Sequence, residues 1–270
     1  MADIKNHATL PTGLVSYWNL DEASGVRHDS HGSNNLTDHN TVGSVVGLGG
    51  YLAANFNGAN EEYLSQSVAS IDNYDLFVND TDVSVGGWFN LSQISTDEHE
   101  TLFESRRNGG SGSRKNLFEI EYRTDNKFEV TYAISANTAG NRRSSTLRLA
   151  VNTWYFLAVT LDKSTGDMRF NVKSTTQELL DEVITGTAGF WVGGSDFKTS
   201  LFSDISRNNN QDYWSSGQMQ SVGVWKSKVL SNDEIDDLHN NGVPLLYEAP
   251  EVANIGGLIG RQMMAINGLK

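Results

Sequence analysis

The sequence predicts an all-β protein, a two-sheet antiparallel sandwich, and two neighbouring runs carry this prediction. In Trp154–Val159, apolar residues occupy both alternating faces, as in a strand buried within a two-sheet core. Met168–Val172 alternates apolar and polar residues. Residues 162–167 between the two runs are polar and include Gly166, which is typical of a hairpin loop. We therefore expect a central hairpin in the middle of the sandwich.

Length and composition are those of one core with short additions at both ends. A chain of 270 residues with 38% hydrophobic composition buries a sizeable core, and sandwiches of this length often form one domain. We divide the chain into an N-terminal arm (1–9), the sandwich (10–247) and a C-terminal tail (248–270). The absence of cysteine excludes disulfides and thiolate metal sites.

Charge and hydropathy argue against a nucleic-acid partner and against a membrane-spanning segment. The formal net charge of −13 argues against a nucleic acid, because binding to its backbone requires clustered Lys and Arg. The first residues lack the apolar core of a secretory signal, and no window is long enough to span a membrane.

Shorter runs of alternating residues predict the remaining strands. Before the central hairpin these are residues 13–20, 51–58, 62–64, 82–91, 102–105, 116–122, 127–134 and 145–150. After the hairpin they are residues 189–194 and 217–225.

Three further segments follow the hairpin. Residues 177–187 fit either a short helix or an irregular edge, and both interpretations stay open. Residues 195–216 are polar and without period, which indicates an extended loop on the rim of the sandwich. A short C-terminal helix begins near Leu230, because Ser231 and Glu234 form a capping box, and Gly242 is its expected stop.

Two motifs at the ends of this region resemble a known family. The first comprises Trp18, Leu20, Asp21, Glu22, Ser24 and Gly25, then Asp29, Ser30, Gly32 and Asn35. The second is the strand 217–225 followed by Leu230, Ser231, Glu234, Ile235 and Gly242. With these spacings the chain resembles the laminin-G-like, concanavalin A-like lectin and glucanase domains over roughly Leu10 to Gly242. The resemblance implies that the sandwich is a jelly roll.

Some members of this family are glycoside hydrolases whose catalytic strand carries the pattern E-x-D-x-x-E. The nearest patterns here are Glu119-Ile120-Glu121, which lacks the third acid, and Glu234-Ile235-Asp236, which falls on the predicted helix. We interpret the first as a solvated strand face and the second as a helix surface. We therefore expect no enzymatic activity.

Calcium is the cofactor that the resemblance brings into consideration, because many laminin-G-like domains hold this ion at the rim. The candidate ligands are rim carboxylates, which suit a hard cation: Asp29, Asp196, Asp204 and Asp212. Asn57 and Gln220-Ser221 replace acids that are common in the family. The histidines show no transition-metal spacing.

An aromatic pair among amides in the rim loop is the candidate sugar site. Sugar rings stack on flat aromatic side chains, while amides bond to their hydroxyl groups. Tyr213 and Trp214 follow Asn209 and Asn210 and fit this description. The alternative is that Trp214 folds under the loop as a plug, and both interpretations stay open.

The C-terminal tail has the composition of a protein interface. Its apolar residues include Ile255, Leu258, Ile259, Met263, Met264 and Ile266.

The first hypothesis for function is therefore a non-enzymatic structural or decoration component of a phage virion. Such a protein would assemble with itself or other structural subunits, in the virion or outside a cell. The second hypothesis is a carbohydrate-binding module that recognises a cell-surface glycan, and a glycoside hydrolase is the third.

Overall fold

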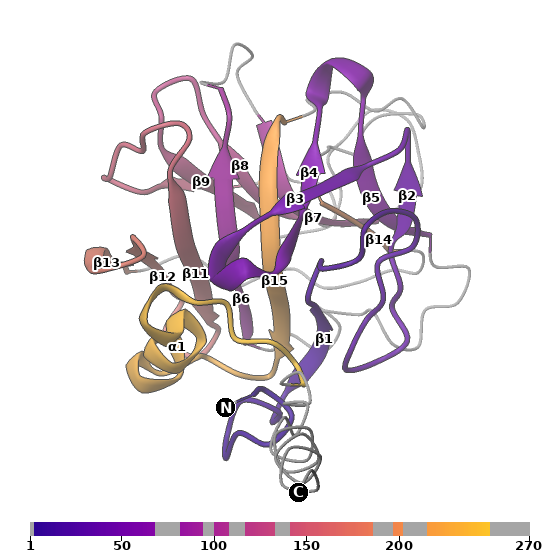
Figure 1. Ribbon diagram of the computed structural model, residues 1–270. Coiled ribbons are helices and arrows are strands. Elements are labelled where there is room, and N and C mark those ends of the chain that lie inside the picture. The colour runs from indigo at the N-terminus through magenta and orange to yellow at the C-terminus, as the bar shows by residue number, and fades with distance from the viewer. Residues whose placement is uncertain are drawn as a thin grey trace, which may run out of the picture.

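The computed structural model describes residues 3–67, 82–93, 100–107, 117–132, 141–185, 197–201 and 215–248. These residues form two antiparallel sheets that pack face to face, with one short α-helix near the C-terminal end (Figure 1). The predicted all-β sandwich is confirmed. No helix among the residues in these ranges is long and apolar enough to cross a membrane.

The first sheet has eight described strands, and at its centre β6 lies between β11 of the predicted hairpin and β15, the last described strand. The order is β13-β12-β11-β6-β15-β4-β3, and β1 also pairs with β15. The bounds are β1 Leu14–Trp18, β3 Gly43–Val46, β4 Leu52–Phe56, β6 Val83–Leu91, β11 Trp154–Asp162, β12 Asp167–Lys173, β13 Glu178–Ile184 and β15 Gly217–Lys226.

The second sheet has seven strands in the order β10-β9-β8-β7-β14-β5-β2. The bounds are β2 Thr37–His39, β5 Tyr63–Ser67, β7 Glu100–Arg107, β8 Leu117–Tyr122, β9 Phe128–Tyr132, β10 Asn141–Ser144 and β14 Phe197–Leu201. Three 3-10 turns complete the described elements: η1 Leu48–Gly50, η2 Gly58–Asn60 and η3 Asn240–Gly242.

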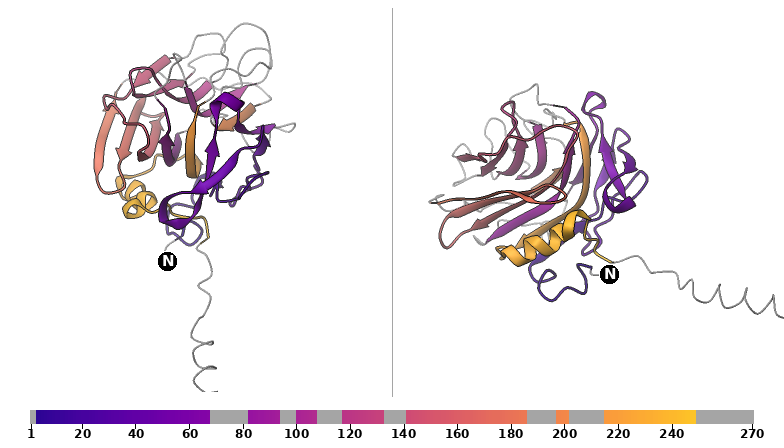
Figure 2. Two further views of the ribbon diagram at one scale, coloured as in Figure 1. Left: turned by 45° about the horizontal axis from the view of Figure 1, so that its top comes forward. Right: turned by 60° about the vertical axis from the view of Figure 1, so that its left-hand side comes forward.

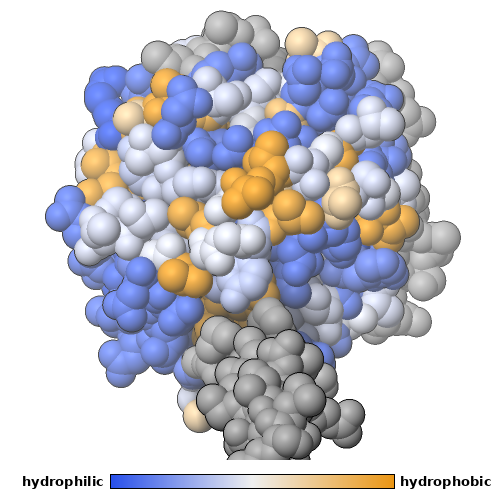
Figure 3. Space-filling view, in the orientation of Figure 1, coloured by the Kyte–Doolittle hydropathy of each residue, from blue (hydrophilic) through white to orange (hydrophobic). Residues whose placement is uncertain are grey.

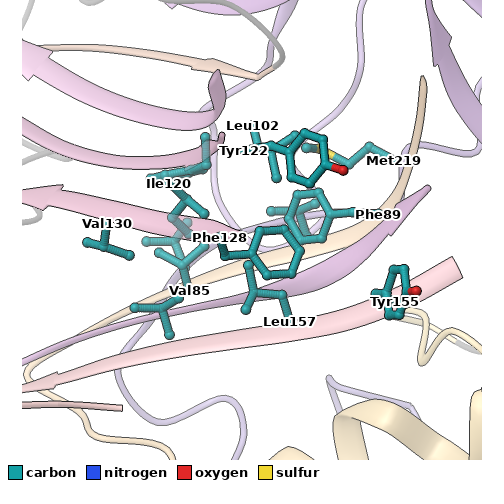
Figure 4. Packing of buried hydrophobic residues seen from close by; sticks show 14 of the residues in the cluster. Val85, Phe89, Leu102, Ile120, Tyr122, Phe128, Val130, Tyr155, Leu157 and Met219 are labelled. Carbon is teal, nitrogen blue, oxygen red and sulfur yellow. The ribbon is translucent and has the colours of Figure 1, made fainter. Parts of the chain in front are cut away.

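The main core lies between the sheets. Val85, Phe89 and Leu157 of the first sheet meet Ile120 and Phe128 of the second, and all five side chains are almost fully buried (Figure 4). Because successive side chains of a strand point to opposite faces, these residues also fix which residues of each strand point away from the core.

A second core covers the outer face of the eight-stranded sheet. The helix α1 (Asn232–His239) lies on this face, away from the seven-stranded sheet (Figure 2). Ile235 and Leu238 of α1 pack with Trp88, Phe156 and Trp225 of the sheet. The helix begins at the predicted capping box, in which Ser231 and Glu234 each accept a hydrogen bond from the other's backbone N–H.

Several predicted boundaries are wrong. Residues 145–150 form no strand; the edge strand is β10, four residues earlier in the chain. The strand β10 contains no apolar residue, so its sequence shows no alternation that could identify it. The rim loop contains the strand β14. The helix α1 ends at His239, and its C-cap is Asn240 in a left-handed conformation (φ 45°), so Gly242 is not the stop. The open segment 177–187 contains β13. The predicted strand 189–194 lies outside the described residues.

Candidate functional site

Most of the predicted site residues lie outside the described part of the chain. These are the sugar-site residues Asn209, Asn210, Tyr213 and Trp214, the carboxylates Asp196, Asp204 and Asp212, and the tail residues Ile255, Leu258, Ile259, Met263, Met264 and Ile266.

Asp29 is the predicted calcium ligand that the structure describes. It is 7% exposed, and both carboxylate oxygens accept backbone hydrogen bonds. Oδ1 accepts from Tyr17 N (3.0 Å) and His31 N (3.1 Å), and Oδ2 accepts from Asn34 N (3.0 Å). Within the described ranges, no group of three or more His, Asp or Glu side chains is arranged to hold a metal ion. Asp29 therefore ties the first loop to β1.

The outer face of the seven-stranded sheet carries buried carboxylates. Glu119 and Glu121, interpreted above as a solvated strand face, are only 2% and 1% exposed, so that interpretation is wrong. Glu104 lies opposite Glu119, and Glu129 lies opposite Glu121. The alternation of residues in the strand predicts that Glu119 and Glu121 point away from the core. It does not predict that other residues cover the outer face on which they lie.

Hydroxyl groups of the same sheet bind these carboxylates. Thr101 Oγ1 donates to Glu119 Oε1 (2.7 Å), and Thr131 Oγ1 donates to Glu121 Oε2 (3.2 Å). At the edge of the cluster, Arg123 pairs with Glu129 (3.2 Å). Because the carboxylates are enclosed and bonded to neighbouring strands, we interpret this face as a structural polar network.

The same region changes the acidity of a neighbouring tyrosine. Burial raises the pKa of Tyr122 to about 12, and the nearby Glu100 carboxylate adds to this rise. Tyr122 therefore remains a neutral hydroxyl group, and it donates to Asn126 Oδ1 (3.2 Å).

An accessible row of uncharged polar side chains crosses the outer face of the other sheet. We call Asn55, Gln218, Asn90 and Trp154 the amide row. Asn55 of β4 lies opposite Gln218 of β15, Gln218 lies opposite Asn90 of β6, and Asn90 lies opposite Trp154 of β11. Directly opposed residues of antiparallel strands share one face, so the four side chains form one line across four strands.

The orientation of the amide row follows from its neighbours in the chain. Ala54, Phe56, Phe89, Tyr155 and Met219 all belong to the main core between the sheets. Each row residue adjoins one or two of these core residues in its strand, so its side chain points to the outer face. All four row residues are half-buried. Figure 3, which views this face, shows hydrophilic and hydrophobic residues interspersed.

The amide row retains hydrogen-bonding capacity. Asn90 Nδ2 donates to Gln218 Oε1 (2.9 Å). Asn90 Oδ1 is shielded from solvent and has no hydrogen-bond partner in the described chain. The side chain of Asn55 likewise makes no hydrogen bond to any described residue, and it is partly exposed. Of these two amides, that of Asn55 is the one that a ligand hydroxyl can reach, and it can both donate and accept a hydrogen bond.

The two ends of the amide row differ. At one end, the half-buried ring of Trp154 packs against the second core. At the other end, Gly43 of β3 lies opposite Asn55, and a Cβ atom placed on Gly43 would have no neighbour within 4 Å. Beside the row, Gln220 fixes η1 through Leu48, accepting from Leu48 N (3.0 Å) and donating to Leu48 O (3.4 Å). The row therefore lies on a rigid sheet between an aromatic ring and an open end.

Sequence reasoning missed the amide row for an identifiable reason. The apolar run around Trp154 predicts a strand but does not tell which face the tryptophan occupies. The row residues come from four segments far apart in the chain, and only the strand register places them side by side. Gln218 lies four residues after the predicted Trp214, so the described row and the predicted rim site adjoin in sequence.

Comparisons with known proteins agree with this architecture. The family described as the concanavalin A-like lectin/glucanases superfamily matches residues 64–236. A search of curated protein sequences found no match.

Solved structures with the same fold have low sequence identity. The binding domain of botulinum neurotoxin DC in complex with SialylT has a TM-score of 0.58 at 12% identity, covering 85% of this chain and 52% of that one. Domain 4 of AbnA, a GH43 extracellular arabinanase from Geobacillus stearothermophilus, was solved in complex with arabinotriose. It has a TM-score of 0.53 at 16% identity, and the match covers 84% of this chain and 98% of that domain. Trypanosoma rangeli sialidase in complex with a difluoro-KDN has a TM-score of 0.54 at 14% identity, covering 84% and 32%. The present chain therefore spans about a third of the sialidase.

Proposed function

Because the chain belongs to the concanavalin A-like lectin/glucanases superfamily, we propose that it is a non-enzymatic carbohydrate-binding module whose ligand contacts the amide row. The observation that carries this proposal is the alignment of three amides with a half-buried tryptophan on one rigid sheet face. Saccharide sites combine an aromatic surface with a few placed polar groups, and the row supplies both. Structural neighbours solved with saccharides, including arabinotriose, support the same function.

The absence of catalysis is part of the proposal. Glycoside hydrolysis requires two carboxyl groups that reach the scissile bond of the substrate. Glu119 and Glu121 are almost fully buried, and each accepts a hydrogen bond from a threonine, which supports a structural role. We expect no hydrolysis of β-glucans; reproducible turnover that disappears in Glu119→Gln or Glu121→Gln would show that the protein is an enzyme.

A glycan array tests the binding function. The wild-type protein should bind a subset of glycans, and Gln218→Ala should weaken this binding at least tenfold. Gln177→Ala is the matched control, because Gln177 is an exposed amide on the β12–β13 turn outside the row. Glycan binding that is unchanged in Gln218→Ala would place the site elsewhere.

A second proposed role, as a structural or decoration component of a phage virion, is favoured by the contact between the N-terminal arm and residues 246–247. Ile4 N donates to Leu246 O (3.0 Å), and Lys5 N donates to Tyr247 O (2.9 Å). The apolar segment 255–269 therefore follows an anchored exit point next to the N-terminal arm. An apolar segment that follows such a point suits docking to another subunit. Carbohydrate binding and virion assembly are compatible roles for different surfaces of one protein.

A further inference from the structure

We infer that the ligand of the amide row is a linear, uncharged oligosaccharide that lies across the strands and occupies about three sugar units. This inference rests on the proposed carbohydrate-binding function and specifies its ligand class. Three properties of the row carry it: its length, its lack of charge and its open end at Gly43.

The length of the row sets the size of the ligand. Neighbouring strands lie about 4.8 Å apart, so the row from Asn55 to Trp154 spans roughly 14 Å. A single sugar ring contacts only one or two positions of such a line. A chain of about three units contacts every position if it runs perpendicular to the strands.

The chemistry of the row sets the charge of the ligand. Its residues are amides and an indole, and the adjacent outer-face residues Trp88, Phe156 and Gln220 are also uncharged. The adjacent row continues from Phe156 to Lys173, but the Lys173 side chain is 8% exposed and its ammonium group is already paired with Glu178 and Asp236. A sialic or uronic acid would therefore meet no available cationic partner within these rows, and the formal net charge of −13 opposes its approach. Amides instead donate to and accept from hydroxyl groups in equal measure.

The ends of the row set the shape of the ligand. The Trp154 ring offers a stacking surface for one sugar. The partly exposed amide of Asn55 can bond to a hydroxyl group of a later unit. Space is open at Gly43, so a linear chain continues past Asn55 without meeting a wall. A branched glycan would have to fit beside η1, which Gln220 holds in place.

Calorimetric titration tests the inference. The probes are linear glucan, mannan and xylan oligosaccharides of one to five units, with oligogalacturonides and sialyl-oligosaccharides as anionic counterparts. We expect affinity in one neutral series to rise up to about three units and then level off. The anionic probes should bind at least tenfold more weakly.

Two variants that preserve the fold assign the binding to the row. Asn55→Ala removes a side chain without a described hydrogen bond, and Gly43→Phe fills the open end at a position with ordinary backbone conformation. Both should weaken binding of the three-unit probe while leaving the melting temperature unchanged, and Gln177→Ala should change neither. Two results would overturn the inference about the ligand but leave the proposed function standing. In one, row-dependent binding is tightest for an anionic probe; in the other, a single sugar binds the row as tightly as the three-unit probe. The absence of row-dependent binding to any saccharide overturns the proposed function as well.

Discussion

At the scale of the residue, Asp29 organises the first loop. Its carboxylate was a candidate calcium ligand, and in the structure it accepts three backbone hydrogen bonds from Tyr17, His31 and Asn34. An acidic residue in a rim loop gives the same sequence pattern whether its carboxylate binds calcium or backbone N–H groups. The sequence pattern alone does not show these hydrogen bonds to backbone N–H groups, which become visible only in the structure.

The Asp29→Ala variant tests this structural role. Removing the carboxylate leaves three backbone N–H groups without an acceptor, which should lower the free energy of unfolding by about 3 kcal/mol. Asp29→Asn keeps one oxygen acceptor and should lose less. Denaturant unfolding with excess calcium and with chelator should give the same loss. A loss that is present only with calcium would identify Asp29 as a metal ligand.

We expect His239 to make stability depend on pH. Burial lowers its pKa from the ordinary 6.5; the neighbouring Lys173 adds to this effect, while the Ser174 carbonyl and Asp236 oppose it. The lowered pKa means that the folded state favours the neutral ring, which stacks on Trp88 (centroids 5.2 Å apart) and bonds to Ser174 O through Nε2 (2.7 Å). Since the unfolded chain takes up the proton more readily, stability is retained above pH 6.5 and falls as the pH decreases below it.

The His239→Gln variant isolates this contribution, because an amide nitrogen can still donate to Ser174 O. We expect the free energy of unfolding of the wild type to decrease more than that of the variant between pH 7.5 and pH 5. Equal decreases in the two proteins would assign the pH dependence to other groups.

At the scale of the element, strands and a helix that depend on local sequence signals are confirmed, whereas several of their predicted boundaries are wrong. The central hairpin and the capping box of α1 depend on residues close together in the chain, and both are confirmed. The edge strand β10 was misplaced because it contains two arginines and lacks a local apolar pattern. The buried face with Glu119 and Glu121 was read as solvated, since alternation indicates direction but not what encloses a face.

The capping box gives a prediction for α1. Ser231→Ala removes the acceptor of Glu234 N (3.2 Å) and should cost about 1 kcal/mol of stability. Ser231→Asp supplies another acceptor at the same position and should stay within a few tenths of a kcal/mol of the wild type. Urea unfolding compares the three proteins; equal stabilities would mean that tertiary packing alone holds the helix.

At the scale of the whole molecule, Ile4 and Leu10 near the start of the chain and Leu245 after α1 complete the second core. Ile4 and Leu10 are fully buried, and Leu10 O accepts from Trp225 Nε1 (2.7 Å). Deleting residues 1–10 should therefore lower the free energy of unfolding by about 3 kcal/mol or more through lost burial. Thermal unfolding and Trp fluorescence measure this loss, and unchanged stability would show that the N-terminal arm is dispensable.

Truncation after Pro250 separates the fold from assembly. The variant retains the contacts of Leu246 and Tyr247 with the N-terminal arm, so we expect an unchanged melting temperature. If residues 255–269 mediate docking, the variant should lose self-association in analytical ultracentrifugation. A truncated protein that assembles like the full chain would remove the main support for the virion role.

The proposed site belongs to this largest scale, which explains why it was not predictable from the sequence. Asn55, Asn90, Trp154 and Gln218 show no local motif, and the pairing of β4, β15, β6 and β11 alone aligns them. The family and fold were predictable because their motifs are local and specific. A binding surface built by strand register becomes visible only in three dimensions.

The most direct test of carbohydrate binding at the amide row is a nuclear magnetic resonance titration with a neutral linear trisaccharide from the series that binds best. The side-chain amide signals of Asn55, Asn90 and Gln218 and the indole N–H signal of Trp154 should shift together and saturate at one concentration. The indole signals of Trp18 and Trp225, whose N–H groups bond to Asn34 O and Leu10 O, should stay in place. Saturable binding that leaves all four row signals unmoved would contradict the account.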